Sequence, residues 1–132
     1  MAIEELFTAV DHIGIATPTL EQGLALYEHV FGLRGAPRQE LPDQGTAVIM
    51  LRCGDTGIEL LAPLAPDSPV GKFLAERGPG MHHVAYRVHD LQAALSYCRN
   101  AGLELIDQQP RQGAGGHLVA FLHPRSTGRV LI

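Results

Sequence analysis

Two stretches of the chain carry the hydrophobic spacing of an amphipathic helix. In Thr19–Phe31 and in Asp90–Ala101, apolar residues recur three and four positions apart, which places them on one helix face. Each stretch opens on a residue type that caps helix N-termini, and a glycine, Gly32 or Gly102, follows its end. The pattern predicts two helices with defined ends, and a third, short helix is expected at Val70–Arg77.

After each of the two long helices the pattern changes to short runs of β-forming residues. These runs are Ala47–Leu51 and Ile58–Leu61 in the first half, and Leu118–Leu122 and Val130–Ile132 in the second. Turn-forming residues separate the last two runs of each half, at positions 54–57 and 124–128. With its opening strand and its helix, each half is therefore βαβββ or close to it.

The two halves are copies of one unit. Val10–Ile15 aligns with Met81–Tyr86, and each segment has the pattern of a strand with a histidine at the same place. Each half is then a βαβββ module, which cannot bury its sheet face alone, so we expect the copies to pack together in one α+β domain. This single domain is expected to span residues 1–132, with module one at about 8–62, a proline-rich linker at about 63–79 and module two at about 80–132.

Strand alternation places both histidines on faces lined by small residues. In the first histidine strand the isoleucines on either side of Gly14 point toward the helix, so His12 lies on the opposite face. In the second strand Tyr86 and its neighbouring valines are expected to pack, and His83 lies opposite them. Small side chains beside each histidine leave a hollow that suits a bound ligand.

Glu59 adds a carboxylate to this face. Its neighbours Ile58 and Leu60 have the character of packing residues, and an acid buried unpaired between them would be costly. Two imidazoles and a carboxylate from separate strands suit a divalent cation such as Co²⁺, Zn²⁺, Ni²⁺ or Mn²⁺. A lone histidine in a strand is more commonly a hydrogen-bonded structural residue. Because a second histidine, His83, stands at the equivalent position, a metal-ligand role for His12 is favoured as much as a structural role.

Five other histidines are expected outside the metal site. His82 points to the packing side of its strand, which favours a structural role or support of a ligand residue. His29 and His89 are expected to be solvated. His117 and His123 flank a predicted strand and either line the mouth of a cavity or stabilise turns.

Charge and apolar run length exclude several classes of function. A net charge of −4 with a single lysine, Lys72, gives no basic field for nucleic acid. No apolar stretch approaches the roughly 18 residues that a membrane span requires, and the start is acidic, so we expect a cytoplasmic protein. Cys53 and Cys98 lack the spacing of a zinc ribbon or of a disulfide scaffold, which predicts reduced, structural thiols.

Motifs spread along the chain match one known family. They are Val10–Ala16, Ile58–Leu61 followed by Pro63, Asp67–Leu74, Gly80–Ala85, Pro110–Ala114 and Phe121–Arg125. With these motifs the chain resembles the methylmalonyl-CoA epimerases of the vicinal oxygen chelate superfamily over nearly its whole length. A histidine strand alone would indicate only the superfamily. The linker and the Phe-Leu-His-Pro run narrow the resemblance to the epimerases within it.

The resemblance implies a fold and a ligand set. The fold is two tandem modules that form a curved, eight-stranded mixed sheet, a cup with helices outside, around one divalent cation per chain. Co²⁺ is the metal that the family favours, with Zn²⁺, Ni²⁺ or Mn²⁺ as alternatives, and a homodimer is common. The ligand positions that carry over are His12, Glu59 and His83. The fourth ligand of the family is a glutamate directly after the strand that reaches Ile132 here, and in the family it also transfers protons. Some members place another glutamate shortly after a Gln-Gly pair, where this chain has Thr46-Ala47-Val48.

The resemblance also implies an activity. It is that of an isomerase that interconverts (2R)- and (2S)-methylmalonyl-CoA through a metal-stabilised enolate, with an acyl-CoA as substrate and Glu59 as the best carboxylate for catalysis. Lys72, Arg77 and Arg111 are candidates to contact the CoA tail. Two alternatives stay open. One is another metalloenzyme of the superfamily, such as a lactoylglutathione lyase or an extradiol-type dioxygenase. The other is a non-catalytic, resistance-type protein that binds a small molecule.

Overall fold

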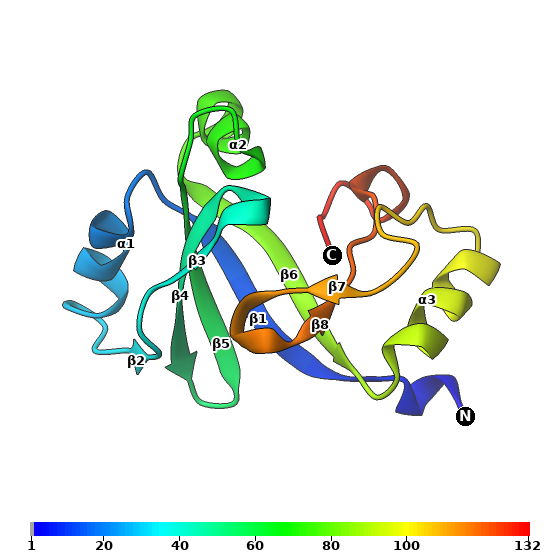
Figure 1. Cartoon of the computed structure of the whole chain (residues 1–132). Coiled ribbons are helices and arrows are strands. Elements are labelled where there is room, and N and C mark those ends of the chain that lie inside the picture. The colour runs from blue at the N-terminus through cyan, green and yellow to red at the C-terminus, as the bar shows by residue number, and fades with distance from the viewer. Residues whose placement is uncertain (1) are drawn as a thin grey trace. The chain divides into compact units, whose positions relative to one another are not determined.

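The computed structural model describes residues 2–132 as a succession of short helices and strands (Figure 1). The α-helices are α1 (Leu20–Tyr27), α2 (Pro69–Arg77) and α3 (Leu91–Asn100). The strands are β1 (Phe7–Ala16), β2 (Arg34–Gly35), β3 (Gln39–Leu41), β4 (Thr46–Cys53), β5 (Thr56–Pro63), β6 (Gly80–Val88), β7 (Arg111–Gln112) and β8 (Leu118–Val119). None of the helices described in residues 2–132 is long and apolar enough to cross a membrane.

The three predicted helices are present, and their capping residues explain where they begin. The Thr19 hydroxyl accepts a hydrogen bond from the backbone N–H of Gln22 at 3.2 Å, and the Asp90 carboxylate accepts one from Ala93 at 3.1 Å. Both contacts satisfy N–H groups that the first turn of a helix leaves without a backbone partner. At its other end α1 stops at Tyr27, four residues before the predicted helix end at Phe31, and residues 28–31 form turns.

The strands form a mixed sheet, which together with the helices confirms the α+β class. Six strands make up the main sheet, in the order β2-β4-β5-β1-β6 with β3 paired to β4. The β1–β5 pair is parallel, whereas β4 and β5 form an antiparallel hairpin. The two remaining strands, β7 and β8, pair only with each other. In this respect the structure corrects the expectation of one eight-stranded sheet, because its strands are divided between two sheets.

The difference arises in the last third of the chain, where the predicted strands are short or missing. Within Leu118–Leu122 only β8 forms, and Leu122 makes a single bridge with Leu105. The segment Val130–Ile132 is not a strand, although its carbonyl oxygens accept backbone hydrogen bonds. Arg129, immediately before it, has a φ of 69°, in the left-handed region where an extended chain cannot continue.

The chain divides into two compact units, His12–His82 and the described part of Met1–Asp11 with His83–Ile132. In the first unit the hairpin of β4 and β5 packs against α1 (Figure 1). The core of this unit contains Leu20, Ala47, Leu51, Leu60 and Ala62. The single-domain organisation and the module boundaries drawn from the sequence stay predictions.

In the second unit the start of β1 runs beside the end of β6. The backbone N–H of His89 donates to the carbonyl oxygen of Leu6 at 2.9 Å, and Arg87 pairs with Asp11 at 3.0 Å. The core of this unit lies under α3 and contains Leu95, Cys98, Leu105 and Leu122.

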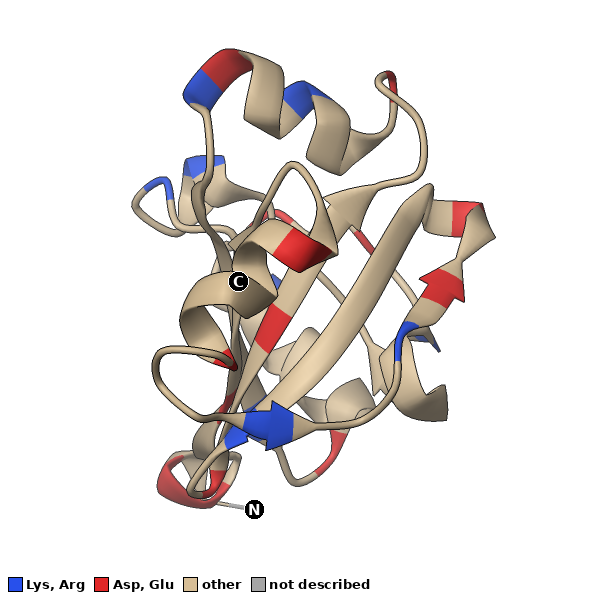
Figure 2. Ribbon diagram, turned by 90° about the vertical axis from the view of Figure 1, so that its left-hand side faces the viewer, with Lys and Arg blue, Asp and Glu red and all other residues tan. Residues whose placement is uncertain are grey.

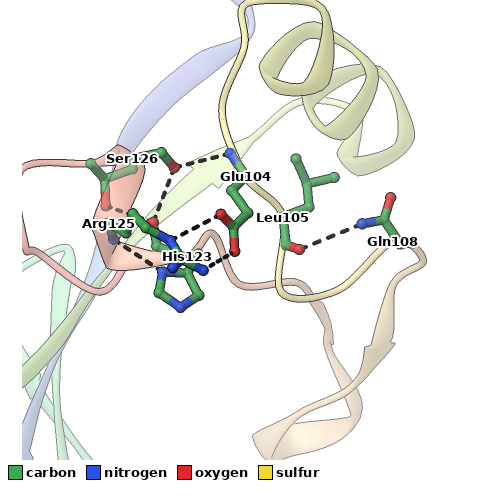
Figure 3. Close-up of polar contacts among 7 residues, drawn as sticks. Glu104, Leu105, Gln108, His123, Arg125 and Ser126 are labelled. Atoms are coloured by element: carbon green, nitrogen blue, oxygen red, sulfur yellow. Dashed lines mark hydrogen bonds and ion pairs between the residues drawn. The ribbon is translucent and has the colours of Figure 1, made fainter.

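A polar network fixes the chain after α3 to the short 3₁₀ helix η4 (Pro124–Ser126), as Figure 3 shows. Arg125 binds the Glu104 carboxylate through two nitrogens, at 3.1 and 2.7 Å, and the Ser126 hydroxyl accepts from the backbone N–H of Glu104 at 3.0 Å. His123 Nδ1 accepts from the backbone N–H of Arg125 at 3.1 Å, which caps η4. Segments about twenty residues apart in the sequence are thereby held together.

Candidate metal site

His12 and Glu59 meet across the parallel pair β1–β5. Gly14 lies opposite Glu59 in the register of this pair, and His12 is two residues earlier in β1, on the same face. The distance from His12 Nε2 to Glu59 Oε1 is 3.7 Å, and both side chains are almost wholly buried. Gly14 has no side chain to separate the two groups, so the imidazole reaches the carboxylate diagonally.

The opposite faces of the same strands pack into the core. Ile15 of β1 and Ile58 and Leu60 of β5 all belong to the apolar cluster beneath α1. Because side chains alternate along a strand, Glu59 must then project away from that cluster. The predicted face of the acid and of His12 is thus confirmed.

His83 lies on β6 and is 5% exposed. Its ring meets the ring of Phe121 edge-to-face, with centroids 5.6 Å apart and an angle of 86° between the planes. Tyr86 of the same strand is 44% exposed and contacts the exposed ring of Phe7, so the prediction that Tyr86 packs in a core is wrong. Alternation identifies the face on which a side chain lies, but it does not show whether another element covers that face.

The three residues expected to bind a metal form one group. His12, Glu59 and His83 each offer a ligand atom, and these atoms all lie within 4.8 Å of one another. Glu59 and His83 are buried and His12 is nearly so. Two imidazole nitrogens and a carboxylate oxygen, shielded from solvent, are a donor set that divalent transition metals accept, so the residues present fit such an ion.

Two of the other histidines make contacts outside this group. The ring of His82 packs on Phe73 of α2 with centroids 5.0 Å apart, and burial, with a smaller contribution from Arg77, lowers the pKa of His82. His123 has the turn role that was one of its two predicted alternatives. The remaining three, His29, His89 and His117, are exposed.

Charged groups are spread over both units rather than gathered in one field. In Figure 2 the uppermost helix, α2, carries both signs, and its charged residues in the sequence are Lys72, Glu76 and Arg77. Arg111 is partly covered, because its guanidinium lies 5.2 Å from the centroid of the Phe121 ring and its Nε is 3.3 Å from the Asp107 carboxylate. Neither Cys53 nor Cys98 is in a disulfide, as expected, and burial raises the pKa of the Cys98 thiol.

Phe121, which touches both His83 and Arg111, was not among the residues predicted for the site. The only signal in the sequence was its place in the Phe-Leu-His-Pro run, since nothing in the periodicity distinguishes this ring from a core residue.

A family model for the Glyoxalase/Bleomycin resistance protein/Dioxygenase superfamily matches residues 11–121. The chain belongs to this superfamily. It is 40% identical to the ethylmalonyl-CoA/methylmalonyl-CoA epimerase of Cereibacter sphaeroides, over 93% of each chain. The crystal structure of methylmalonyl-CoA epimerase from Mycobacterium tuberculosis superposes with a TM-score of 0.93 and 34% identity, covering 100% of this chain and 89% of that one. For a variant of the Streptomyces coelicolor epimerase, in complex with 2-nitronate-propionyl-CoA, the TM-score is 0.90 and the identity 34%, over 95% and 91% of the chains.

These similarities confirm the resemblance to the epimerase branch of the superfamily and the expectation of an enzyme of the isomerase class. They also agree with the α+β architecture, since the similarity extends over nearly the whole chain in each case. The metal, the substrate and the roles of single residues belong to the proposal that follows.

Proposed function

We propose that this protein is a metal-dependent epimerase that interconverts the (2R) and (2S) forms of methylmalonyl-CoA. The observation that carries the proposal is the buried group of His12, Glu59 and His83, whose ligand atoms lie within 4.8 Å of one another. The similarity to an epimerase named for ethylmalonyl-CoA and methylmalonyl-CoA supports a 2-substituted malonyl-CoA as the substrate class. A homodimer, which the family resemblance implies, stays a prediction.

The proposed reaction exchanges the proton on carbon 2, between a thioester and a carboxylate. Removal of this proton leaves negative charge on the neighbouring oxygens, and a divalent cation, when bound, supplies fixed positive charge that favours it. His12 and His83 would hold the cation through neutral imidazole nitrogens, and Glu59 would add a negative ligand. Because these side chains are nearly inaccessible to solvent, electrostatic interactions between them and a substrate are stronger than in water.

Deuterium incorporation at carbon 2 of methylmalonyl-CoA in D₂O tests this proposal directly. The protein is freed of metal by chelation, assayed, and then assayed again after addition of one equivalent of Co²⁺. We expect exchange only in the reloaded protein. In His12→Ala and His83→Ala we expect weak metal retention and a loss of exchange on the order of a hundredfold or more, because the positive charge is lost from the site.

His89→Ala is the matched control, because this histidine lies just beyond β6 and is exposed. It should retain both metal loading and exchange. If His12→Ala and His83→Ala behave as the control does, the assignment of the site is wrong. Metal binding without exchange would instead indicate another metalloenzyme of the superfamily, and absence of both would indicate a small-molecule binding protein.

A further inference from the structure

The side chain of Phe121 connects the buried ring of His83 to a cation. Its ring lies edge-to-face with the His83 imidazole at 5.6 Å, and the Arg111 guanidinium lies 5.2 Å from its centroid. Phe121 is only partly exposed, and it follows β8 in a segment that is not itself a strand. Its position therefore depends on contacts other than a regular ladder of strand hydrogen bonds.

The hydrogen bonds of its backbone come from one loop. The backbone N–H of Phe121 donates to Asp107 Oδ2 at 2.8 Å, and its carbonyl oxygen accepts from the N–H groups of Ile106 and Asp107, at 2.9 and 3.2 Å. The same Oδ2 lies 3.3 Å from Nε of Arg111. One carboxylate thus fixes both the backbone of Phe121 and the cation against its ring, which leaves the ring little freedom to turn.

We propose that Phe121 is a positioning residue, which holds the His83 imidazole in the orientation that metal binding needs. This inference rests on the proposed function, in which His83 is a ligand. An aromatic edge packed on an imidazole restricts rotation of the ligand ring, as hydrogen bonds from supporting residues do in other metal sites. Arg111 and Asp107 contribute to this orientation through Phe121.

The chain contains a second group of the same composition, which supplies a matched control. Phe73 of α2 contacts the ring of His82 at 5.0 Å and an angle of 70°, and the Arg77 guanidinium lies 5.6 Å from the Phe73 centroid. His82 and His83 are neighbours in β6, so their side chains leave opposite faces of the strand. Loss of the Phe73 ring removes an equivalent arginine–phenylalanine–histidine contact without touching the proposed ligand.

The test compares Phe121→Leu, Phe121→Tyr, Arg111→Met and Phe73→Leu in the full chain. Three quantities are measured for each: the dissociation constant for Co²⁺, the visible absorption spectrum of the Co²⁺ complex, and the thermal unfolding of the metal-free protein. We expect Phe121→Leu to weaken Co²⁺ binding about tenfold and to change the spectrum, which reports ligand geometry. Phe121→Tyr keeps the ring, so its Co²⁺ affinity and spectrum should match those of the unsubstituted protein. Arg111→Met should weaken binding less, because Asp107 still holds the Phe121 backbone.

Phe73→Leu separates positioning from general stability. It should lower the unfolding temperature as Phe121→Leu does, while leaving Co²⁺ affinity and spectrum unchanged. If both leucine variants change affinity and spectrum equally, or if neither changes them, Phe121 does not position His83. These results leave the proposed function standing, because that function is tested separately, by deuterium exchange and by the metal loading of His12→Ala and His83→Ala.

Discussion

The carboxylate of Glu59 could have either of two roles in the site. It is 6% exposed and lies 3.7 Å from the imidazole of His12, so it can serve as a metal ligand or accept a proton from the substrate. Glutamine has nearly the same shape, and its amide oxygen is still able to coordinate a cation, but it cannot take up a proton under ordinary conditions. Substitution by glutamine therefore separates the two roles.

For Glu59→Gln we expect weaker metal binding and a normal rate of deuterium exchange once Co²⁺ is saturating. The loss of affinity should be about tenfold, because a neutral oxygen replaces a charged one. Exchange is measured against Co²⁺ concentration for both proteins. A rate that stays lower by about a hundredfold at saturation would assign Glu59 to proton transfer instead.

At the scale of elements, the pair of Glu104 and Arg125 links the chain after α3 to η4 (Figure 3). The usual pKa of a glutamate side chain is about 4.5, and the hydrogen bond from Arg125 holds the pKa of Glu104 below that value. Above that value the carboxylate is ionised in both the folded and the unfolded chain, but only the folded chain has the ion pair, so the pair stabilises the fold. As the pH falls through the lowered pKa, the carboxylate takes up a proton and this contribution is lost.

We expect Glu104→Gln to unfold at a slightly lower urea concentration than the unsubstituted protein at about pH 7, because it lacks the ion pair. The difference should shrink as the pH falls below the usual glutamate range, and it should also shrink at high salt because both groups are exposed. Glu76→Gln, on the exposed face of α2, is the control and should show little change. A difference that does not depend on pH would mean that the ion pair contributes nothing.

How well an element could be predicted depended on whether its signals were local. Thr19 and Asp90 cap their helices as expected, because a cap bonds to the next turn of the same segment. The strand expected at Val130–Ile132 needed a partner far away in the sequence, and its apolar run carries no information about one. The backbone of Arg129, with its φ of 69°, is likewise invisible to a hydrophobic pattern.

At the scale of the whole molecule, the candidate site could be predicted because the sequence pattern repeats. His12 and His83 stand at equivalent places in the two predicted modules, and Glu59 was recognised because it is an acid between two aliphatic residues. The repeat does not single out Phe121, because the equivalent position of the first half is Met50 and not an aromatic residue. Its relation to His83 arises from a loop fixed by Asp107, which only the folded chain brings into contact with the Phe121 backbone.

Metal binding should couple to the stability of the whole protein, since the three proposed ligands lie in β1, β5 and β6, far apart in the sequence. A cation that binds the folded chain and not the unfolded one stabilises it by about 2.7 kcal/mol at a free concentration one hundred times its dissociation constant. We therefore expect chelation to lower the unfolding temperature and Co²⁺ to restore it in proportion to the logarithm of its concentration. His12→Ala should show neither response, whereas His89→Ala should show both.

Since Mg²⁺ prefers sites with oxygen ligands and retained waters, it should not replace Co²⁺ at equal concentration. If the unfolding temperature responds equally to Mg²⁺ and Co²⁺, or if it rises with Co²⁺ in His12→Ala, the metal binds elsewhere than at His12, Glu59 and His83.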